Sequence, residues 1–455
     1  MIDLSIDFAG IKSPNPFWLA SAPPTNSGYQ IMKAYDAGWG GAVWKTLGMP
    51  TINVSSRYGS TNYRNTRMAG FSNIELISDR PLEDNLREMR EVTKRFPDHA
   101  TIASLMVDTQ AEWNDIIKQV EDAGAKGIEL NFGCPHGMCE RGMGSAVGQD
   151  PVALKAIVEW VMDAANIPVI TKLSPNISHI TDPGLAAVEA NTDAISLINT
   201  VKSIVGIDLD TYAPYPVVDG KGSNGGYCGP AVKPIALHML KDLKQHELIK
   251  DTPISGIGGI ETWRDVVEFI LLGATSVQVC TAVMHYGFGI VREMEAGLIQ
   301  FMEDKGYNTI YDFAGKALPN VLPWKDLNLK YDVKAKINED KCVGCDLCYI
   351  ACDDGAHQAI ALPLDGTSRI PSIIEENCVG CNLCSLVCPV EGCITMERKD
   401  DGTQHETWDE LTLADQIPNT WNDDRSGGKG HYVPVPSKAF DSIRKDKSGE
   451  RANQK

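Results

Sequence analysis

Over roughly 290 residues from Phe17 onward, short apolar segments alternate with longer amphipathic segments. The apolar segments resemble buried strands, and they lie at residues 17–20, 42–46, 101–106, 127–131, 168–173, 194–199, 253–257 and 276–280. Helical patterns lie between them, at residues 81–96, 111–123, 151–165, 184–190, 234–246 and 262–272. Eight strand–helix units fit a (β/α)8 TIM barrel better than an open doubly wound sheet. The sequence therefore predicts an α/β fold with an active site at the carboxyl ends of its strands.

Cysteines dominate the chain after the predicted barrel. Two runs share the spacing C-x2-C-x2-C-x3-C, and they consist of Cys342, Cys345, Cys348 and Cys352 and of Cys378, Cys381, Cys384 and Cys388. In the bacterial ferredoxin spacing, the fourth cysteine of each run ligates the cluster of the other run. We therefore expect two [4Fe–4S] clusters, one on Cys342, Cys345, Cys348 and Cys388, the other on Cys378, Cys381, Cys384 and Cys352.

Paired zinc sites or buried thiols are the alternatives to this cluster interpretation. Zinc needs only four ligands and does not impose such a duplicated run. Asp353 stands where a proline is expected after the first run, which is a minor departure. Cys393 lies outside both runs and receives no role.

The length of 455 residues exceeds the size at which a single hydrophobic core stops growing, so more than one domain is expected. We expect a barrel at residues 1–317, a linker at 318–335, a ferredoxin-like domain at 336–400 and a polar tail at 401–455. The net charge of −18 argues against nucleic-acid binding and against an anionic membrane surface. No apolar run approaches the roughly 18 residues of a spanning helix, so we expect a cytoplasmic protein.

The segment from Glu129 to Gly144 combines a strand end with a thiol and a glycine-rich loop. Asn131 and Cys134 follow an apolar strand, and the turn at His136 comes directly after them. A small buried hydrophobe is the ordinary alternative for Cys134. The turn and the loop favour a catalytic role, and a thiol with a pKa of about 8.5 is protonated enough near neutral pH to be a general acid.

Two lysines, Lys45 and Lys172, also stand at the ends of apolar strands. A solvated or ion-paired lysine is the ordinary interpretation of either one alone, but their recurrence at two strand ends favours a binding site.

Small residues mark the ends of the last two predicted strands, at Gly258-Gly259 and Cys280-Thr281, where TIM barrels commonly bind phosphate. A phosphate site beside clusters that carry single electrons implies a flavin, and FMN has the single phosphate that such a site would bind. No strand-linked G-x-G-x-x-G occurs, so electrons are expected to enter from a second protein.

From about residue 4 to residue 396, the chain resembles the dihydropyrimidine dehydrogenases, in particular the FMN and iron–sulfur subunit of the bacterial NAD-dependent enzymes. The matching motifs are Asn15-Pro16-Phe17, Leu19-Ala20-Ser21-Ala22, Lys45-Thr46, Asn73 to Ser78, Asn131 to Gly144, Lys172, Asn199-Thr200 and Pro234 to Leu237. The resemblance implies reversible reduction of the 5,6 double bond of uracil or thymine. It also implies a hetero-oligomer with a FAD-containing, NADH-oxidising subunit.

The resemblance assigns roles to individual residues. The pyrimidine would be hydrogen-bonded by Asn73, Glu75, Asn131, Asn199 and Thr200. FMN would be held by Ala20, Ser21, Lys45, Lys172, Gly225, Gly226, Gly258, Gly259, Cys280 and Thr281. Hydride would pass from the flavin to ring carbon 6, while Cys134 would protonate ring carbon 5 and His136 would lie on the closing loop.

Two residues depart from the family pattern: Gly133 stands where serine is usual, and Cys139 stands where a smaller or hydroxylated residue is usual. Two alternative functions stay open. A dihydroorotate dehydrogenase-like flavin enzyme would need cations for the carboxylate of its substrate. A non-catalytic electron-transfer subunit would not need Cys134.

Overall fold

The computed structural model describes residues 2–48, 51–63, 66–135, 142–363, 369–399 and 405–413. His136 and Cys139, to which the sequence analysis drew attention, lie outside these residues, as does most of the expected polar tail. The chain divides into two compact units, Met1–Asn320 and Val321–Lys455, each of which is described by itself. Within the described ranges, no helix has both the length and the apolarity needed to cross a membrane.

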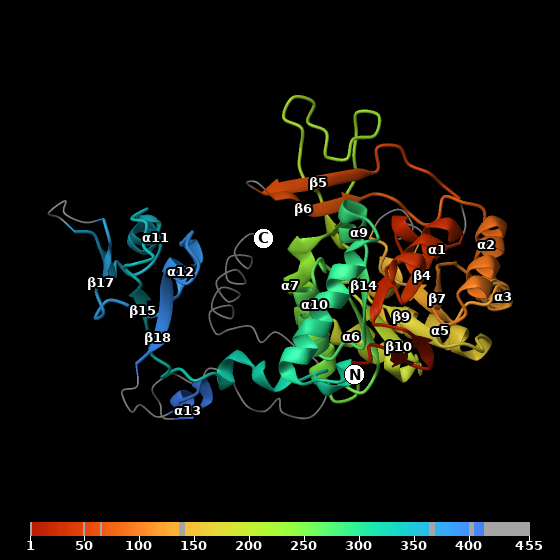
Figure 1. Ribbon diagram of the computed structural model, residues 1–455. Helices are drawn as coiled ribbons and strands as arrows, with labels where there is room; N and C mark the ends of the chain where they lie inside the picture. Colours follow the sequence, from red (N-terminus) through yellow and green to blue (C-terminus); the bar gives the residue numbers. More distant parts are fainter. Residues whose placement is uncertain are drawn as a thin grey trace, which may run out of the picture. The chain divides into compact units, whose positions relative to one another are not determined.

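Eight parallel strands form a closed barrel in the first unit, which confirms the predicted fold (Figure 1). In chain order these strands are β3 (Phe17–Leu19), β4 (Gly41–Leu47), β7 (Ala100–Leu105), β8 (Gly127–Asn131), β9 (Val169–Lys172), β10 (Ala194–Leu197), β13 (Ile254–Ile257) and β14 (Ser276–Val279). Each strand pairs with its predecessor, and β14 pairs with β3 to close the barrel. All eight coincide with predicted strands to within a few residues.

Helices surround the barrel strands (Figure 1). They are α1 (Gly28–Ala37), α2 (Leu82–Arg95), α3 (Gln110–Asp122), α5 (Pro151–Ala164), α6 (Thr181–Glu189), α7 (Lys233–Gln245), α8 (Trp263–Leu271) and α10 (Ile290–Lys305), with the short α4 (Ser145–Gly148) and α9 (Thr281–Tyr286). A hairpin of β1 (Ile6–Phe8) and β2 (Ile11–Ser13) precedes the barrel.

Local sequence signals determine where several helices begin. Helix α3 starts after Thr109, whose hydroxyl accepts the Glu112 N–H while the Glu112 carboxylate caps the Thr109 N–H in return. Thr262 and Asp265 form the same reciprocal box before α8. These caps satisfy amide groups that the first turn of a helix leaves unpaired.

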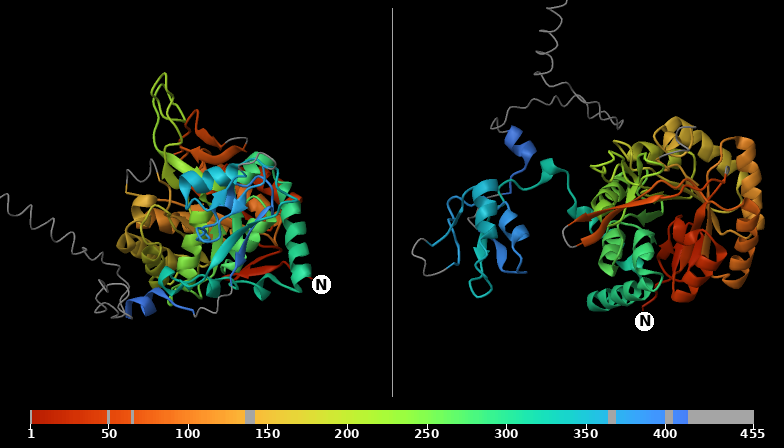
Figure 2. Two further views of the ribbon diagram at one scale, coloured as in Figure 1. Left: turned by 90° about the vertical axis from the view of Figure 1, so that its left-hand side faces the viewer. Right: turned by 90° about the horizontal axis from the view of Figure 1, so that it is seen from above.

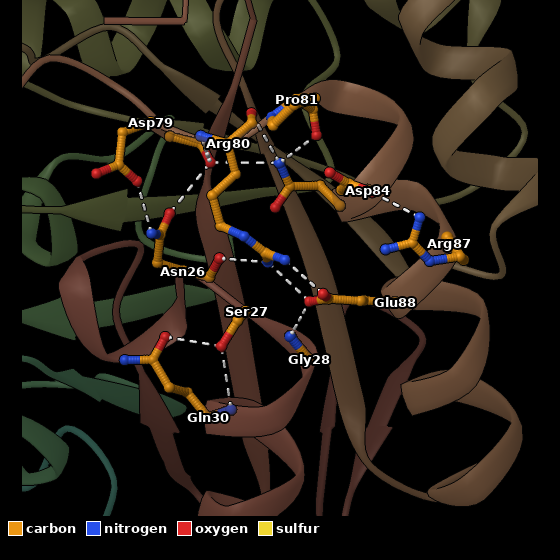
Figure 3. A network of polar contacts seen from close by, with 12 residues as sticks. Asn26, Ser27, Gly28, Gln30, Asp79, Arg80, Pro81, Asp84, Arg87 and Glu88 are labelled. Atoms are coloured by element: carbon orange, nitrogen blue, oxygen red, sulfur yellow. Dashed lines mark hydrogen bonds and ion pairs between the residues drawn. The ribbon is translucent and has the colours of Figure 1, made fainter. Parts of the chain in front are cut away.

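A polar network ties the start of α1 to α2 (Figure 3). The Glu88 carboxylate on α2 pairs with the Arg80 guanidinium and accepts the Gly28 N–H at 2.7 Å. Asn26 donates to Asp79 at 2.8 Å in the same network. An anion at the N-terminus of α1 is favourable because the helix dipole is positive there.

A second sheet stands at one end of the barrel, and the sequence analysis did not predict it. It is antiparallel, with the order β11 (Val201–Ser203), β12 (Gly225–Cys228), β6 (Thr66–Asn73) and β5 (Tyr58–Tyr63). Figures 1 and 2 show β5 and β6 lying across the end of the barrel strands. The strands of this second sheet come from distant parts of the chain, and β5 is largely polar. Apolar periodicity therefore gives little sign of the sheet.

The second unit is built on two short antiparallel pairs, β15 (Val333–Ile337) with β18 (Ile394–Arg398) and β16 (Ile360–Ala361) with β17 (Ser372–Ile373). Its helices are α11 (Leu347–Gly355), α12 (Leu383–Val387) and α13 (Trp408–Leu413). Cysteine side chains provide much of its small core.

Candidate active site and cluster cavities

A cleft opens where the barrel strands end and β6 and β12 begin, with about 1100 Å³ between its walls and at its mouth. It brings together Cys134 and all five expected pyrimidine contacts, namely Asn73, Glu75, Asn131, Asn199 and Thr200. Eight of the expected cofactor residues also line it, namely Ala20, Ser21, Lys45, Lys172, Gly258, Gly259, Cys280 and Thr281. The structure does not bring Gly225 and Gly226 to the cleft wall; a Cβ on either would meet Ser72 or Thr200, so both serve strand packing.

Carboxamide groups form a chain of hydrogen bonds along one wall of the cleft. Asn131 donates from Nδ2 to the Thr46 hydroxyl at 2.9 Å, and Asn199 donates from Nδ2 to Oδ1 of Asn131 at 2.9 Å. The Thr200 N–H donates to Oδ1 of Asn199 at 2.8 Å. These bonds hold the amide planes in place and define which atoms donate and which accept.

The backbone at Gly133 lies against the side chain of Asn199. A Cβ built at this position would lie 2.2 Å from Cβ of Asn199 and 2.3 Å from its Nδ2. Real Cβ atoms do not approach other atoms so closely, and the Asn199 carboxamide is held by its hydrogen bond to Asn131. The absence of a side chain at position 133 therefore makes room for Asn199.

Cys134 follows β8 and is 6% exposed. It packs in a small apolar cluster with Ile77, Met106 and Met143. The chain returns to it after the loop, since the Ser145 N–H donates to the Cys134 carbonyl at 3.0 Å. Gly144 makes this return possible: its φ is +58°, and a Cβ there would lie 2.9 Å from the Cys134 carbonyl oxygen.

Glu75 lies on the cleft wall, and its carboxylate accepts from Lys45, from Arg57 and from Tyr58. Its Oε1 lies 2.5 Å from Nη1 of Arg57, 2.9 Å from the Tyr58 hydroxyl and 3.2 Å from Nζ of Lys45. The hydrogen bond to Glu75 raises the pKa of the Arg57 guanidinium, and burial together with the Glu75 charge raises that of the Tyr58 phenol. The sequence analysis missed Arg57 and Tyr58, because their pairing with Glu75 depends on the unpredicted sheet.

Lys172 projects into the cleft from a buried polar network inside the barrel. Its Nζ lies 3.0 Å from Oε1 of Glu129, whose side chain is completely buried. Oε2 of Glu129 accepts from the Ser196 hydroxyl at 2.8 Å and from Nε2 of Gln278 at 3.0 Å. A charged residue inside the apolar strand GIELN was a signal for Glu129 that the sequence analysis did not use.

Gln278 also lines the cleft, and within the described chain its buried Oε1 has no hydrogen-bond partner. Such an orphaned acceptor suits a ligand with an N–H group, because an unpaired buried polar atom is costly.

The turn after β13 leaves little room for side chains. Gly258 and Gly259 have φ values of +132° and +70°, and a Cβ on Gly259 would lie 2.7 Å from Cβ of Lys233. Thr281, which also lines the cleft, donates to Sγ of Cys228 at 3.2 Å, and burial raises the pKa of this thiol to about 11. A glycine turn for phosphate, two lysines and an orphaned acceptor together fit a flavin nucleotide.

Two cavities in the second unit are lined by cysteines from both runs. Cavity I is lined by Cys342, Cys345, Cys348 and Cys388, together with Cys393. Cavity II is lined by Cys352, Cys378, Cys381 and Cys384. The fourth cysteine of each run thus lies with the first three of the other run, as the spacing led us to expect.

The cysteines of each cavity surround a space rather than a point. Among the residues whose placement is described, no three His, Cys, Asp or Glu side chains converge as a single metal ion would require. Zinc ligands lie about 2.3 Å from one central ion.

Sequence comparisons match both units. The Dihydroorotate dehydrogenase family model matches residues 3–302, and the 4Fe-4S dicluster domain model matches residues 335–396. The NAD-dependent dihydropyrimidine dehydrogenase subunit PreA of Escherichia coli (strain K12) is 45% identical over 359 residues, which are 79% of this chain and 87% of the relative. The chloroplastic dihydropyrimidine dehydrogenase (NADP(+)) of Arabidopsis thaliana is 43% identical over 338 residues, 71% of this chain and 79% of the relative.

A third relative comes from the other branch of these enzymes. The catalytic subunit of dihydroorotate dehydrogenase B (NAD(+)) of Pyrococcus abyssi is 37% identical over 323 residues, which are 69% of this chain and 99% of the relative.

Proposed function

The chain belongs to the dihydroorotate dehydrogenase family, and we propose that it is the catalytic subunit of a dihydropyrimidine dehydrogenase that reduces the 5,6 double bond of uracil and thymine. Relatives named dihydropyrimidine dehydrogenase are 45% and 43% identical to it, against 37% for the dihydroorotate dehydrogenase.

The observation that carries the proposal is the meeting of three carboxamides and one thiol in a single cleft. Asn73, Asn131 and Asn199 line the cleft together with Cys134. A uracil ring presents alternating donors and acceptors, and a carboxamide can donate and accept in the same plane. The hydrogen bond from Asn199 to Asn131 fixes the direction of these groups before a substrate arrives.

Cys134 is proposed to hold the proton that is delivered to ring carbon 5. Cys134 lines the cleft and packs against Ile77, Met106 and Met143, and a thiol is a group that can donate a proton. Cys134 is 6% exposed and lines the cleft. The chemistry that bound FMN would supply is hydride transfer to ring carbon 6.

The residues proposed to hold FMN are those of the cleft wall that are not amides. Lys45 and Lys172 would face the flavin ring, and the backbone at Gly258, Gly259 and Thr281 would bind its phosphate. Glu129 keeps the Lys172 ammonium in place.

Cavities I and II are proposed to hold one [4Fe–4S] cluster each, through four cysteines in each case. Such clusters carry single electrons. We further propose that the electrons come from a FAD-containing, NADH-oxidising partner in a cytoplasmic hetero-oligomer. The E. coli relative is itself named as a subunit of an NAD-dependent enzyme, which supports a partner.

Dihydroorotate is a poorer substrate candidate because of the charge at Glu75. Its carboxylate would need a cation, but Lys45 and Arg57 are both already paired with the Glu75 carboxylate. A second carboxylate here would meet like charge, whereas an uncharged pyrimidine would not.

The test uses anaerobically purified protein with counted FMN and iron and a reduced viologen dye as electron donor. We expect uracil and thymine to be converted to their 5,6-dihydro products, and about eight iron atoms per chain. Activity with dihydroorotate but with neither pyrimidine would contradict the proposal.

A second arm of the test isolates the thiol. Cys134→Ala should slow turnover by roughly 10²–10⁴, the contribution of one acid–base group, while FMN stays bound. Cys134→Ser keeps the size of the side chain but not its acidity and should be slow as well. An unchanged rate in both variants would favour a non-catalytic role for Cys134, and no pyrimidine-dependent reoxidation of reduced flavin would favour an electron-transfer subunit.

A further inference from the structure

Cavity I contains one thiol more than a cubane cluster requires. A [4Fe–4S] cluster binds four cysteines, yet five cysteines line this cavity, the fifth being Cys393. Cavity II is lined by four. The difference is independent of the spacing of the two runs, since Cys393 belongs to neither.

Cys393 is placed beside ligands rather than in a pocket of its own. It is 3% exposed, and it lines cavity I together with Cys342 and Cys388. Its Sγ lies 3.7 Å from the Asn338 carbonyl oxygen. Its N–H donates to the Val390 carbonyl at 3.2 Å, which closes the turn that joins it to Cys388.

The internal repeat of the second unit identifies the position that corresponds to Cys393 in the other half. The Cys393 carbonyl accepts the Asn338 N–H at 2.7 Å, and the Ala359 carbonyl accepts the Ile374 N–H at 2.8 Å. Cys393 directly precedes β18, and Ala359 directly precedes β16.

The backbone carbonyls of Asn338 and Ile374 also have equivalent hydrogen-bond partners in the two repeats. Asn338 and Ile374 each accept an N–H at 3.1 Å, from Cys342 and Cys378, the first cysteines of the two runs. Ala359 lines cavity II as Cys393 lines cavity I. One half of the repeat thus carries a thiol where the other carries a methyl group.

We propose that Cys393 is a reserve ligand of the cluster in cavity I, able to replace Cys388 as the fourth cysteine. The inference rests on the proposed cluster content of both cavities. In the exchange, the iron–Sγ bond of Cys388 breaks and an iron–Sγ bond to Cys393 forms, while the proton that leaves the Cys393 thiol is taken up by the Cys388 thiolate. In a variant that lacks Cys388, no bond has to break and the Cys393 proton leaves to solvent. Cavity II has no such reserve, because Ala359 cannot bind iron.

The experiment counts iron in the purified full-length chain and records electron paramagnetic resonance spectra after reduction with dithionite. Wild type and Cys393→Ala should both hold about eight iron atoms per chain. Cys388→Ala should also keep about eight, whereas Cys388→Ala/Cys393→Ala should keep about four. The spectrum of two coupled clusters should persist in Cys388→Ala. In Cys388→Ala/Cys393→Ala it should be replaced by the spectrum of one isolated cluster.

Cavity II provides the matched control. The iron content of Cys352→Ala should be about four atoms per chain. Cys352→Ala/Ala359→Cys should hold more iron than Cys352→Ala, because it places a thiol at the position of cavity II that corresponds to Cys393. Circular dichroism shows whether each variant is folded. If Cys388→Ala does not fold, Cys388→Ser is compared with Cys388→Ser/Cys393→Ala, and the second should hold less iron.

Equal iron in the variants of position 388 with and without Cys393 would overturn the reserve ligand. A wild-type count of about four would instead contradict the proposed cluster content, so the two failures are distinguishable.

Discussion

The Lys172 ammonium lies 3.0 Å from a Glu129 carboxylate that has no exposed surface. Lys172 lines the cleft, whereas Glu129 is held from behind by Ser196 and Gln278. A buried charge is stable only when it is paired and hydrogen-bonded, so the two residues depend on each other. The ammonium group that faces the cleft is therefore positioned by a carboxylate inside the barrel.

Removing both members of this pair should cost less stability than the sum of the two single removals. Glu129→Gln leaves the Lys172 ammonium without its counter-charge, and Lys172→Met leaves the Glu129 carboxylate without its counter-charge. Each substitution should lower the free energy of unfolding by about 3–5 kcal/mol. The double variant should be more stable than the sum of the two losses predicts. Urea unfolding of all four proteins measures this coupling, and strictly additive losses would show that the pair is not coupled.

A side chain at position 133 should disturb Asn199. Gly133→Ser places a Cβ where Asn199 lies 2.2 Å away, and the hydrogen bond from Asn199 to Asn131 should break. Losing one such contact costs about 1–1.5 kcal/mol, so KM for uracil should rise by roughly tenfold, with a smaller change in kcat. Steady-state kinetics measures both constants.

Gly289 provides the matched control for this substitution, since nothing lies within 4 Å of a Cβ built there. Gly289→Ser should leave KM unchanged. A Gly133→Ser enzyme with an ordinary KM would mean that Asn199 is not a pyrimidine contact.

Arg57 should matter to the cleft although it is not among the residues that the sequence identified. Arg57→Met keeps the apolar stem and removes the donor that lies 2.5 Å from Glu75. Glu75 then loses a charged hydrogen bond, which is worth about 1.5–3 kcal/mol, and its carboxylate should be less well positioned. We expect KM for uracil to rise by about tenfold or more, with FMN content unchanged.

The same change at Arg87 serves as a control. Arg87 pairs with Asp84 on the exposed surface of α2, far enough into solvent that the pair is worth little (Figure 3). Arg87→Met should bind uracil as the wild type does. Equal behaviour of the two variants would place Arg57 outside the binding site.

The sequence predicted the barrel well because its strands are short, apolar and separated by amphipathic helices. Strands β8 and β9 end at Asn131 and Lys172, and Cys134 follows β8, so the sequence could place these three residues at the carboxyl end of the barrel. Their roles came from the family resemblance and stay predictions. The cysteine spacing was equally informative, since ligand sets follow from it without knowledge of the packing.

Other parts of the site depend on contacts that no local pattern records. Arg57 reaches Glu75 only because β5 pairs with β6, and β12 joins them from more than a hundred residues away. The resemblance assigned Gly225 and Gly226 to the cofactor, but neither lines the cleft, and a Cβ on either would meet Ser72 or Thr200. The role of Cys393 depends on which cavity it enters, and the sequence could not indicate that.

The Arg80–Glu88 pair should make the stability of the barrel depend on pH. The hydrogen bond from Arg80 lowers the pKa of the Glu88 carboxyl. Burial opposes this shift, and the hydrogen bond from the Gly28 N–H reinforces it. A carboxylate with a lowered pKa stabilises the fold above its ordinary pKa of about 4.5, and this contribution is lost as the pH falls through the lowered value. The free energy of unfolding of Glu88→Gln should therefore be about 1–2 kcal/mol lower than that of wild type at pH 7, and this difference should shrink in acid.

Urea unfolding at several pH values measures the difference. Asp84→Asn is the exposed control, and its free energy of unfolding should differ from that of wild type by less than about 0.5 kcal/mol at every pH. A deficit that stays constant down to the acid limit of folding would mean that Glu88 acts through packing rather than through its charge.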